Sequence, residues 1–276
     1  MPGTNRMSAY FSRRGPGFVA AAMTLLSIHG CSDPTLQPWH TERLTAEFSV
    51  EKVDEIHSFD DYLRLEDELF AQLEEAVYAH TATGPEYALL RYSAGSAADP
   101  RQRQPNWNRS FELGVDAPTG GVLLLHGMSD SPYSLRALGE MLNQQGYQVL
   151  GLRLPGHGTA PSGLTRVSWQ DMAAAVRLGM QHLSARVGGK PIHIVGYSTG
   201  APLALDFALD ALQGDTSPAP ASLILISPAI GLSPAAALAE AKRRQKEHPG
   251  RYVDEIFGEH DGGGTQVLYL SHVPFE

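Results

Sequence analysis

The stretch HIVGYSTGAPLAL, residues His193 to Leu205, places a serine between two glycines in the pattern G-x-S-x-G. An apolar run precedes this serine and an alanine- and leucine-rich helical pattern follows it, so we expect a strand to turn directly into a helix at Ser198. A serine at such a turn adopts a strained backbone, and Gly196 and Gly200 leave room for the strand and the helix to approach each other. This context predicts a nucleophilic serine.

Apolar runs alternate with helical patterns on both sides of this turn. Strands are expected over 121–127, 147–154, 191–196 and 221–227, and helices over 131–146, 168–189 and 201–212. Connections that contain helices of ten or more residues imply parallel strands joined by right-handed crossovers. We therefore predict an α/β fold with a mainly parallel sheet, helices on both faces, and working groups at the carboxyl ends of the strands.

Two glycine-rich loops follow these strands. The loop HGMSDSP begins at His126, and the loop LPGHGTAP contains His157. We expect the backbone N–H of Met128 beside the nucleophile, where it would form a two-donor oxyanion hole with the N–H of Thr199. The two histidines are expected to shape these loops. No pair of residues has the spacing of metal ligands, so no metal site is predicted.

Four motifs occur in the order LLLHGMSDSPYSLRALGEML, LRLPGHGTAPSGL, GYSTGAPLAL and LISPAIGLSP. Together they resemble the α/β-hydrolase fold family, in particular its monoacylglycerol-lipase or serine-aminopeptidase-like branch, over roughly residues 120–234. The resemblance implies cleavage of an ester or amide through an acyl-serine intermediate, without a cofactor. Carboxylic esters are favoured over peptides because the sequence reveals no acidic pocket for a substrate amino terminus. A serine aminopeptidase and a catalytically impaired lipoprotein with a binding or structural role remain the alternatives.

The residues that would activate Ser198 are harder to place. A serine nucleophile needs an adjacent base that is itself oriented by an acid. The segments FGEHD and QVLYLSHVPFE resemble the acid and histidine segments of the family, which implies Asp261 as acid and His272 as base.

Geometry argues against placing both residues at the carboxyl ends of parallel strands. Only three glycines separate Asp261 from Thr265, and they reach about 11 Å, whereas the chain would have to return along a strand of about 23 Å. Three explanations stay open. The domain is incomplete at its C-terminal end, or it is a compressed active variant in which residues 265–271 form an edge strand, or the last residues are unrelated to the triad.

The first thirty residues differ from the rest of the chain. Three arginines precede the uncharged apolar run over 18–28, which is the layout of a signal peptide and is too short to span a bilayer. The run ends in SIHGC, which resembles the lipobox of bacterial lipoproteins and implies cleavage before Cys31 and acylation of its sulfur. Ser32 then implies the outer membrane, facing the periplasm. A secretory signal with an incidental cysteine is the alternative.

The expected domain order follows from these patterns. It is a signal peptide over 1–30, a tether over 31–57, a helical extension and linker over 58–110 with a helix capped by Ser58, and an α/β-hydrolase domain over 111–276 with a lid-like helix over 233–248. Loss of the three N-terminal arginines would change the net charge from −9 to −12. Such an acidic protein is a poor candidate for nucleic-acid binding, because phosphate contacts need clustered lysine and arginine. The expected partners are a small-molecule or lipid ester and a membrane.

Overall fold

The computed structural model describes residues 36–214, 218–229 and 267–270. The chain divides into two compact units, Met1–Gln37 and Pro38–Glu276. Its described residues form a sheet in the order β1-β3-β2-β4-β5-β6. The strands are β1 (Phe111–Leu113), β2 (Gly120–Leu125), β3 (Tyr147–Leu152), β4 (Ile192–Tyr197), β5 (Ser222–Ile226) and β6 (Val267–Leu270).

The four central strands, β3, β2, β4 and β5, are parallel. Their register places the last residues of neighbouring strands opposite one another: Leu125 pairs with Leu152 and with Gly196, and Tyr197 pairs with Ile226. The segments that follow these strands therefore leave from the same edge of the sheet. The predicted α/β fold with a mainly parallel sheet is confirmed.

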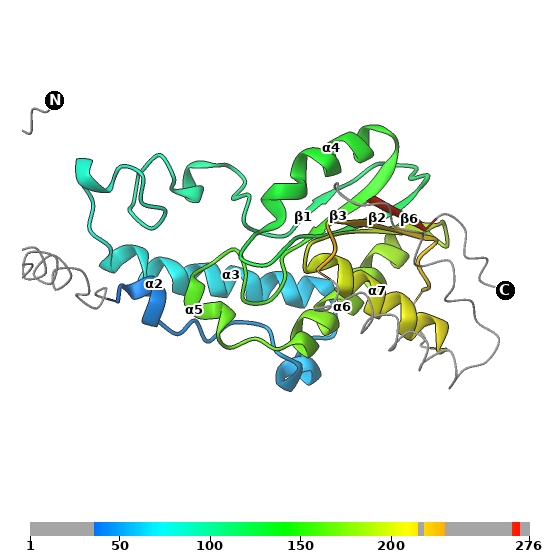
Figure 1. The fold of residues 1–276 in the computed structure, drawn as a ribbon, viewed down its shortest axis with the longest axis horizontal. Helices are drawn as coiled ribbons and strands as arrows, with labels where there is room; N and C mark the ends of the chain where they lie inside the picture. Colours follow the sequence, from blue (N-terminus) through cyan, green and yellow to red (C-terminus); the bar gives the residue numbers. More distant parts are fainter. Residues whose placement is uncertain (1–35, 215–217, 230–266, 271–276) are drawn as a thin grey trace, which may run out of the picture. The chain divides into compact units, whose positions relative to one another are not determined.

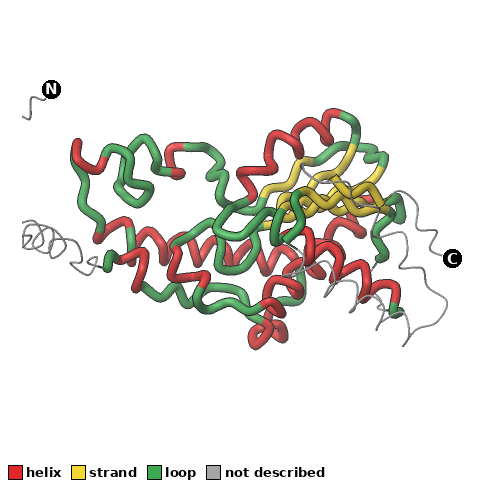
Figure 2. Tube along the Cα trace, in the orientation of Figure 1, coloured by secondary structure: helices red, strands yellow, loops and turns green. Residues whose placement is uncertain are grey.

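Helices pack on both faces of the sheet (Figures 1 and 2). Successive strand residues point to opposite faces, and they belong to different apolar clusters: Leu123 and Leu125 pack with residues of α6 and α7, whereas Val122 and Leu124 pack with α4. The helices are α2 (Pro38–Thr41), α3 (Phe59–Ala76), α4 (Arg136–Gln144), α5 (Pro161–Leu164), α6 (Trp169–Val187) and α7 (Gly200–Leu212), with 3-10 turns at Val50–Glu55, Tyr78–His80, Pro85–Tyr87, Pro100–Gln102 and Pro132–Leu135.

Two long helices begin at the serines that the sequence indicates as caps. Ser58 accepts a hydrogen bond from the N–H of Asp61 at the start of α3. Ser168 and Asp171 form a reciprocal capping box at the start of α6, which ends at Gly188 in the left-handed conformation. These bonds satisfy N–H groups that would otherwise lack a partner in the first turn.

The segment before α3 differs from the expected tether over 31–57. Leu44, Ala46 and Phe48 are buried, and Phe48 belongs to the main core. The N–H of Val50 also donates to Asp171 Oδ1 at 2.7 Å. The three buried residues alternate with the polar Thr45 and Glu47, so one side of this irregular segment packs inward. From Leu44 onward, the chain is therefore part of the folded unit.

The last described strand, β6, lies at the edge of the sheet, where one of the three open explanations expects an edge strand over 265–271. The histidine segment resembles a final parallel strand of the family, but β6 is antiparallel to β5, with Val267 opposite Ile226 and Leu270 opposite Leu223. The carboxyl end of β6 thus lies at the edge of the sheet opposite the one where β4 ends. An antiparallel edge strand needs no long crossover, which fits the short spacing in the sequence.

Several predictions concern residues outside the described ranges. They are the signal peptide, Cys31, the lid-like helix over 233–248, Asp261 and His272. Among the helices that are described, none is both long enough and apolar enough to cross a bilayer.

Candidate active site

Ser198 lies in the sharp turn between β4 and α7, as predicted. Its φ angle is 51°, in the left-handed region that costs a residue other than glycine about 1–2 kcal/mol. The turn is held by backbone hydrogen bonds: the N–H of Ser198 donates to Ile226 O at 2.9 Å, and its carbonyl accepts from Ala201 and Ala229. The side chain is half-buried. A strained backbone retained at a strand end is typical of a functional residue.

The two glycines of the motif are required by close backbone contacts. A Cβ atom on Gly196 would lie 2.5 Å from Gly200 O and 2.6 Å from the Cα of Ala201. A Cβ on Gly200 would lie 2.6 Å from the carbonyl carbon of Leu125 and closer still to its oxygen. The start of α7 therefore touches the ends of both β4 and β2, which brings the loop after β2 next to Ser198.

We call residues 126–129 the oxyanion loop. A Cβ atom on Gly127 would lie 3.1 Å from Ser198 Cβ, so this loop packs directly against the serine. Within the described residues, the N–H groups of Met128 and Thr199 have no hydrogen-bond acceptor. Thr199 also precedes the first turn of α7, where the helix dipole favours negative charge. Their predicted role as oxyanion donors stays a prediction.

His126 is fully buried and both of its ring nitrogens are engaged. Nδ1 donates to Gly127 O at 2.9 Å, and Nε2 accepts from the N–H of Leu154 at 3.1 Å. Burial and the neighbouring His157 lower the pKa of His126 to about 3, so the ring is neutral at physiological pH. His126 connects the ends of β2 and β3, in line with its expected role in shaping the loop.

His157 packs beside this connection. Its ring lies edge-on to that of His126, with centroids 5.1 Å apart, and its Nδ1 lies 2.8 Å from Pro155 O. Burial lowers the pKa of His157 as well. Among the residues that the structure describes, no group of three or more histidine, cysteine or acidic side chains is arranged to bind a metal ion.

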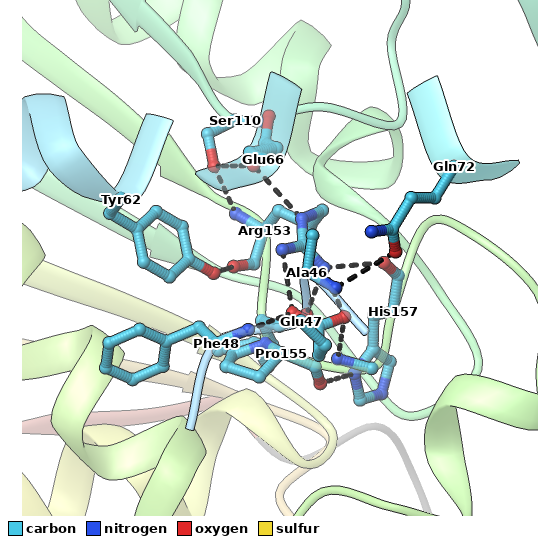
Figure 3. A network of polar contacts seen from close by, with 12 residues as sticks. Ala46, Glu47, Phe48, Tyr62, Glu66, Gln72, Ser110, Arg153, Pro155 and His157 are labelled. Carbon is cyan, nitrogen blue, oxygen red and sulfur yellow. Dashed lines mark hydrogen bonds and ion pairs between the residues drawn. The ribbon is translucent and has the colours of Figure 1, made fainter. Parts of the chain in front are cut away.

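The sequence reasoning missed a buried arginine with two acidic partners (Figure 3). Arg153 Nε lies 3.0 Å from Glu66 Oε2, and its Nη2 lies 3.0 Å from Glu47 Oε1. Burial alone would lower the pKa of Arg153, but the nearby carboxylates outweigh it and raise this pKa. One signal was present in the sequence: Glu66 shares a helix face with Tyr62 and Leu69, which are both buried.

The chemistry that this arrangement supports is acyl transfer. Ser198, whose backbone is strained, lies just before the N-terminus of α7, and two backbone N–H groups without acceptors among the described residues lie in the adjoining turns. Among the described residues, no histidine is hydrogen-bonded to Ser198. Both ring nitrogens of His126 are engaged elsewhere, and His157 is buried beside that ring, with its Nδ1 2.8 Å from Pro155 O and no partner for its Nε2.

A comparison with known families agrees with this geometry. The family described as serine aminopeptidase, S33, matches residues 116–268, more than half of the chain. The chain belongs to this family. The matched region contains Ser198 and the oxyanion loop. Glu47 and Glu66, the partners of Arg153, precede it, so the serine aminopeptidase S33 match does not include the segment that holds this arginine.

Individual relatives cover shorter stretches. A thermostable monoacylglycerol lipase from Bacillus sp. (strain H-257) is 39% identical over 88 residues, which is 32% of this chain and 34% of the lipase. A carboxylesterase from Bacillus subtilis (strain 168) is 33% identical over 84 residues, 30% of this chain and 34% of that protein. The match thus spans about a third of the length of each of these curated relatives. A solved structure of a metagenome-derived lipolytic enzyme is 30% identical, with a TM-score of 0.41, and the match covers 48% of this chain and 51% of that one.

Proposed function

We propose that this protein is a serine hydrolase that cleaves carboxylic esters through an acyl-serine intermediate. The observation that supports this most strongly is the position of Ser198, at a φ of 51° between β4 and α7 and against Gly127. Ser198 Oγ would attack the ester carbonyl as its proton passes to a base, and the alcohol would leave with that proton. Water would then attack the acyl-serine, releasing the carboxylic acid and restoring the serine hydroxyl.

The N–H groups of Met128 and Thr199 would bind the oxyanion in both steps. A hole of two donors stabilises charge that develops in the transition state, and loss of one such donor costs about 3–4 kcal/mol. His272 is proposed as the base and Asp261 as the acid that orients it. Because β6 ends at the edge of the sheet opposite Ser198, this proposal requires the chain after Leu270 to return to the edge where Ser198 lies. Substitution of His272→Gln or Asp261→Asn is expected to lower kcat by about 10³- to 10⁴-fold, and a loss below tenfold would remove that residue from the mechanism.

Esters are proposed over peptides for two reasons. Two of the matching relatives are named as a monoacylglycerol lipase and a carboxylesterase, although the family description names an aminopeptidase. In addition, two apolar side chains near the nucleophile are exposed: Tyr197, which directly precedes Ser198, exposes 37% of its surface, and Met128, which follows the Gly127 that packs on Ser198, exposes 53%. Apolar side chains at the mouth of a site favour an acyl chain over a charged amino terminus.

The test compares p-nitrophenyl esters of increasing acyl length with aminoacyl anilides. Ester hydrolysis that disappears in Ser198→Ala is expected. The matched control is Ser227→Ala, because Ser227 also has a positive φ, of 45°, at the end of the neighbouring strand, and this variant should keep its activity. Cleavage of anilides alone would replace the ester proposal with the aminopeptidase alternative. Inactivity on both substrates would favour the catalytically impaired lipoprotein.

We further propose that Cys31 is acylated and anchors the protein in the outer membrane, facing the periplasm. The support is the lipobox-like stretch SIHGC after an apolar run. A fatty-acid label is expected to enter the wild-type protein and to be lost in Cys31→Ser, which should appear in the soluble periplasmic fraction. A wild-type protein that takes up no label would indicate a secretory signal with an incidental cysteine.

A further inference from the structure

Glu47 accepts three hydrogen bonds from the segment that follows β3. We call this segment, residues 153–158, the β3 loop. Glu47 Oε1 accepts from Arg153 Nη2 at 3.0 Å, and Oε2 accepts from Arg153 Nη1 at 3.1 Å and from the N–H of Gly156 at 2.8 Å. The carboxylate thus binds both the side chain and the backbone of the loop, across more than 100 residues of sequence.

Helix α3 holds the other side of the same arginine (Figure 3). Glu66 Oε2 accepts from Arg153 Nε at 3.0 Å and from Ser110 Oγ at 2.9 Å. Ser110 Oγ in turn accepts from the N–H of Arg153, and Tyr62 donates its hydroxyl hydrogen to the carbonyl of Arg153. Because every polar group of Arg153 has a partner, its backbone and its guanidinium are both fixed in position.

The β3 loop is bonded in turn to the oxyanion loop. Arg153 Nη1 donates to His157 O at 3.1 Å, and the N–H of Leu154 donates to His126 Nε2. The other nitrogen of His126 donates to Gly127 O, and Gly127 packs on Ser198. A continuous series of short contacts therefore leads from Glu47 to the backbone beside the nucleophile.

We propose that Glu47 is a positioning residue, which fixes the β3 loop through Arg153 and Gly156 and so sets the place of the Met128 N–H beside Ser198. The proposal rests on the proposed hydrolase function. It assigns a role to the segment before the family match, because Glu47 lies outside residues 116–268. Displacement of a catalytic group by about 1 Å can reduce a rate by about 10²-fold.

The test measures how fast a fluorophosphonate phosphonylates Ser198, with release of fluoride, because the phosphonyl oxygen of this probe occupies the oxyanion hole. In Glu47→Ala, the second-order rate constant is expected to fall about 10- to 100-fold, with the same final yield of adduct and with KM for a p-nitrophenyl ester changed less than about threefold. A purely structural role would lower the final yield through unfolded protein and leave the rate constant of the folded fraction unchanged.

The matched control is Glu74→Ala. Glu74 lies on α3 and pairs with Arg101, but its side chain is 55% exposed, and among the described residues it has no hydrogen bond or ion pair with the β3 loop. The rate constant of Glu74→Ala should therefore stay within about twofold of wild type. If Glu47→Ala does not fold, Glu47→Gln keeps the shape of the side chain and is expected to slow phosphonylation about three- to tenfold. A wild-type rate in either folded Glu47 variant overturns this proposal alone. A wild-type protein that does not react overturns the hydrolase proposal with it.

Discussion

At Gly200, the structure predicts that a single added methyl group lowers the stability of the fold. This glycine begins α7 and is buried against the end of β2. In Gly200→Ala, the new Cβ would lie 2.6 Å from the carbonyl carbon of Leu125 and 2.8 Å from His126 O. All of these neighbours are backbone atoms of a central strand and of the oxyanion loop, so no side chain can rotate to make room.

The magnitude follows from two opposing terms. Ordinary carbon–oxygen contacts lie near 3.3–3.6 Å, so the helix start and the strand end must separate by roughly 1 Å. Overpacking of this kind costs about 1–3 kcal/mol and sometimes more, whereas alanine gains at most about 1 kcal/mol over glycine in a helix. Because the contact is so short, we place the overpacking cost at the upper end of its range and expect Gly200→Ala to lower the free energy of unfolding by about 2–3 kcal/mol.

Gly179 provides the control for this prediction. It is also a buried helical glycine, in α6, but a Cβ there would meet only side-chain atoms, at 3.4–3.7 Å. Gly179→Ala should therefore leave stability unchanged or raise it by up to about 1 kcal/mol. Thermal unfolding followed by circular dichroism should show a Tm lower by about 5–10 °C for Gly200→Ala only. Equal melting temperatures for Gly200→Ala and Gly179→Ala would refute the tight contact between α7 and β2.

Three further predictions concern the buried polar groups and the helix caps. Arg153→Ala should lower the free energy of unfolding in urea by about 3–5 kcal/mol because two buried carboxylates lose their partner, whereas loss of the 51% exposed Glu140 should cost under about 0.5 kcal/mol. The pKa of His126 is about 3 in the folded state and near 6.5 when unfolded, so acid favours the unfolded chain. The contribution of His126 to the free energy of unfolding is therefore fully present above about pH 6.5 and falls by about 2 kcal/mol between pH 7 and pH 5. His126→Gln should show a shallower decline in unfolding free energy over that range, and an unchanged slope would contradict the assignment. Ser168→Ala, which removes the cap bond to the Asp171 N–H, should cost about 1 kcal/mol by chemical denaturation, and a change below about 0.3 kcal/mol would argue against the capping box.

The central sheet and the serine turn could be predicted from sequence because their signals are local. The apolar runs of β2, β4 and β5, the caps at Ser58 and Ser168, and the glycines that flank Ser198 all lie within a few residues of the features they determine. Helix period, strand length and turn chemistry act over that same short range.

The Arg153 network could not be predicted in the same way. Glu47 and Arg153 are 106 residues apart, and Glu66 and Arg153 are 87 apart, so nothing in the local pattern of either partner identifies the other. The buried stretch around Phe48 is short and has no regular secondary structure, which made a tether the simpler interpretation. The direction of β6 depends on pairing with β5, which periodicity does not reveal.

The central claim is that Ser198 is the nucleophile of a serine hydrolase. Its most direct test is the intact mass of the protein after incubation with a fluorophosphonate, followed by peptide mapping of the adduct. We predict one phosphonyl group per wild-type molecule, attached to Ser198, one group on Ser227→Ala, and none on Ser198→Ala. A wild-type protein that gains no mass, or an adduct that persists in Ser198→Ala, would contradict the account.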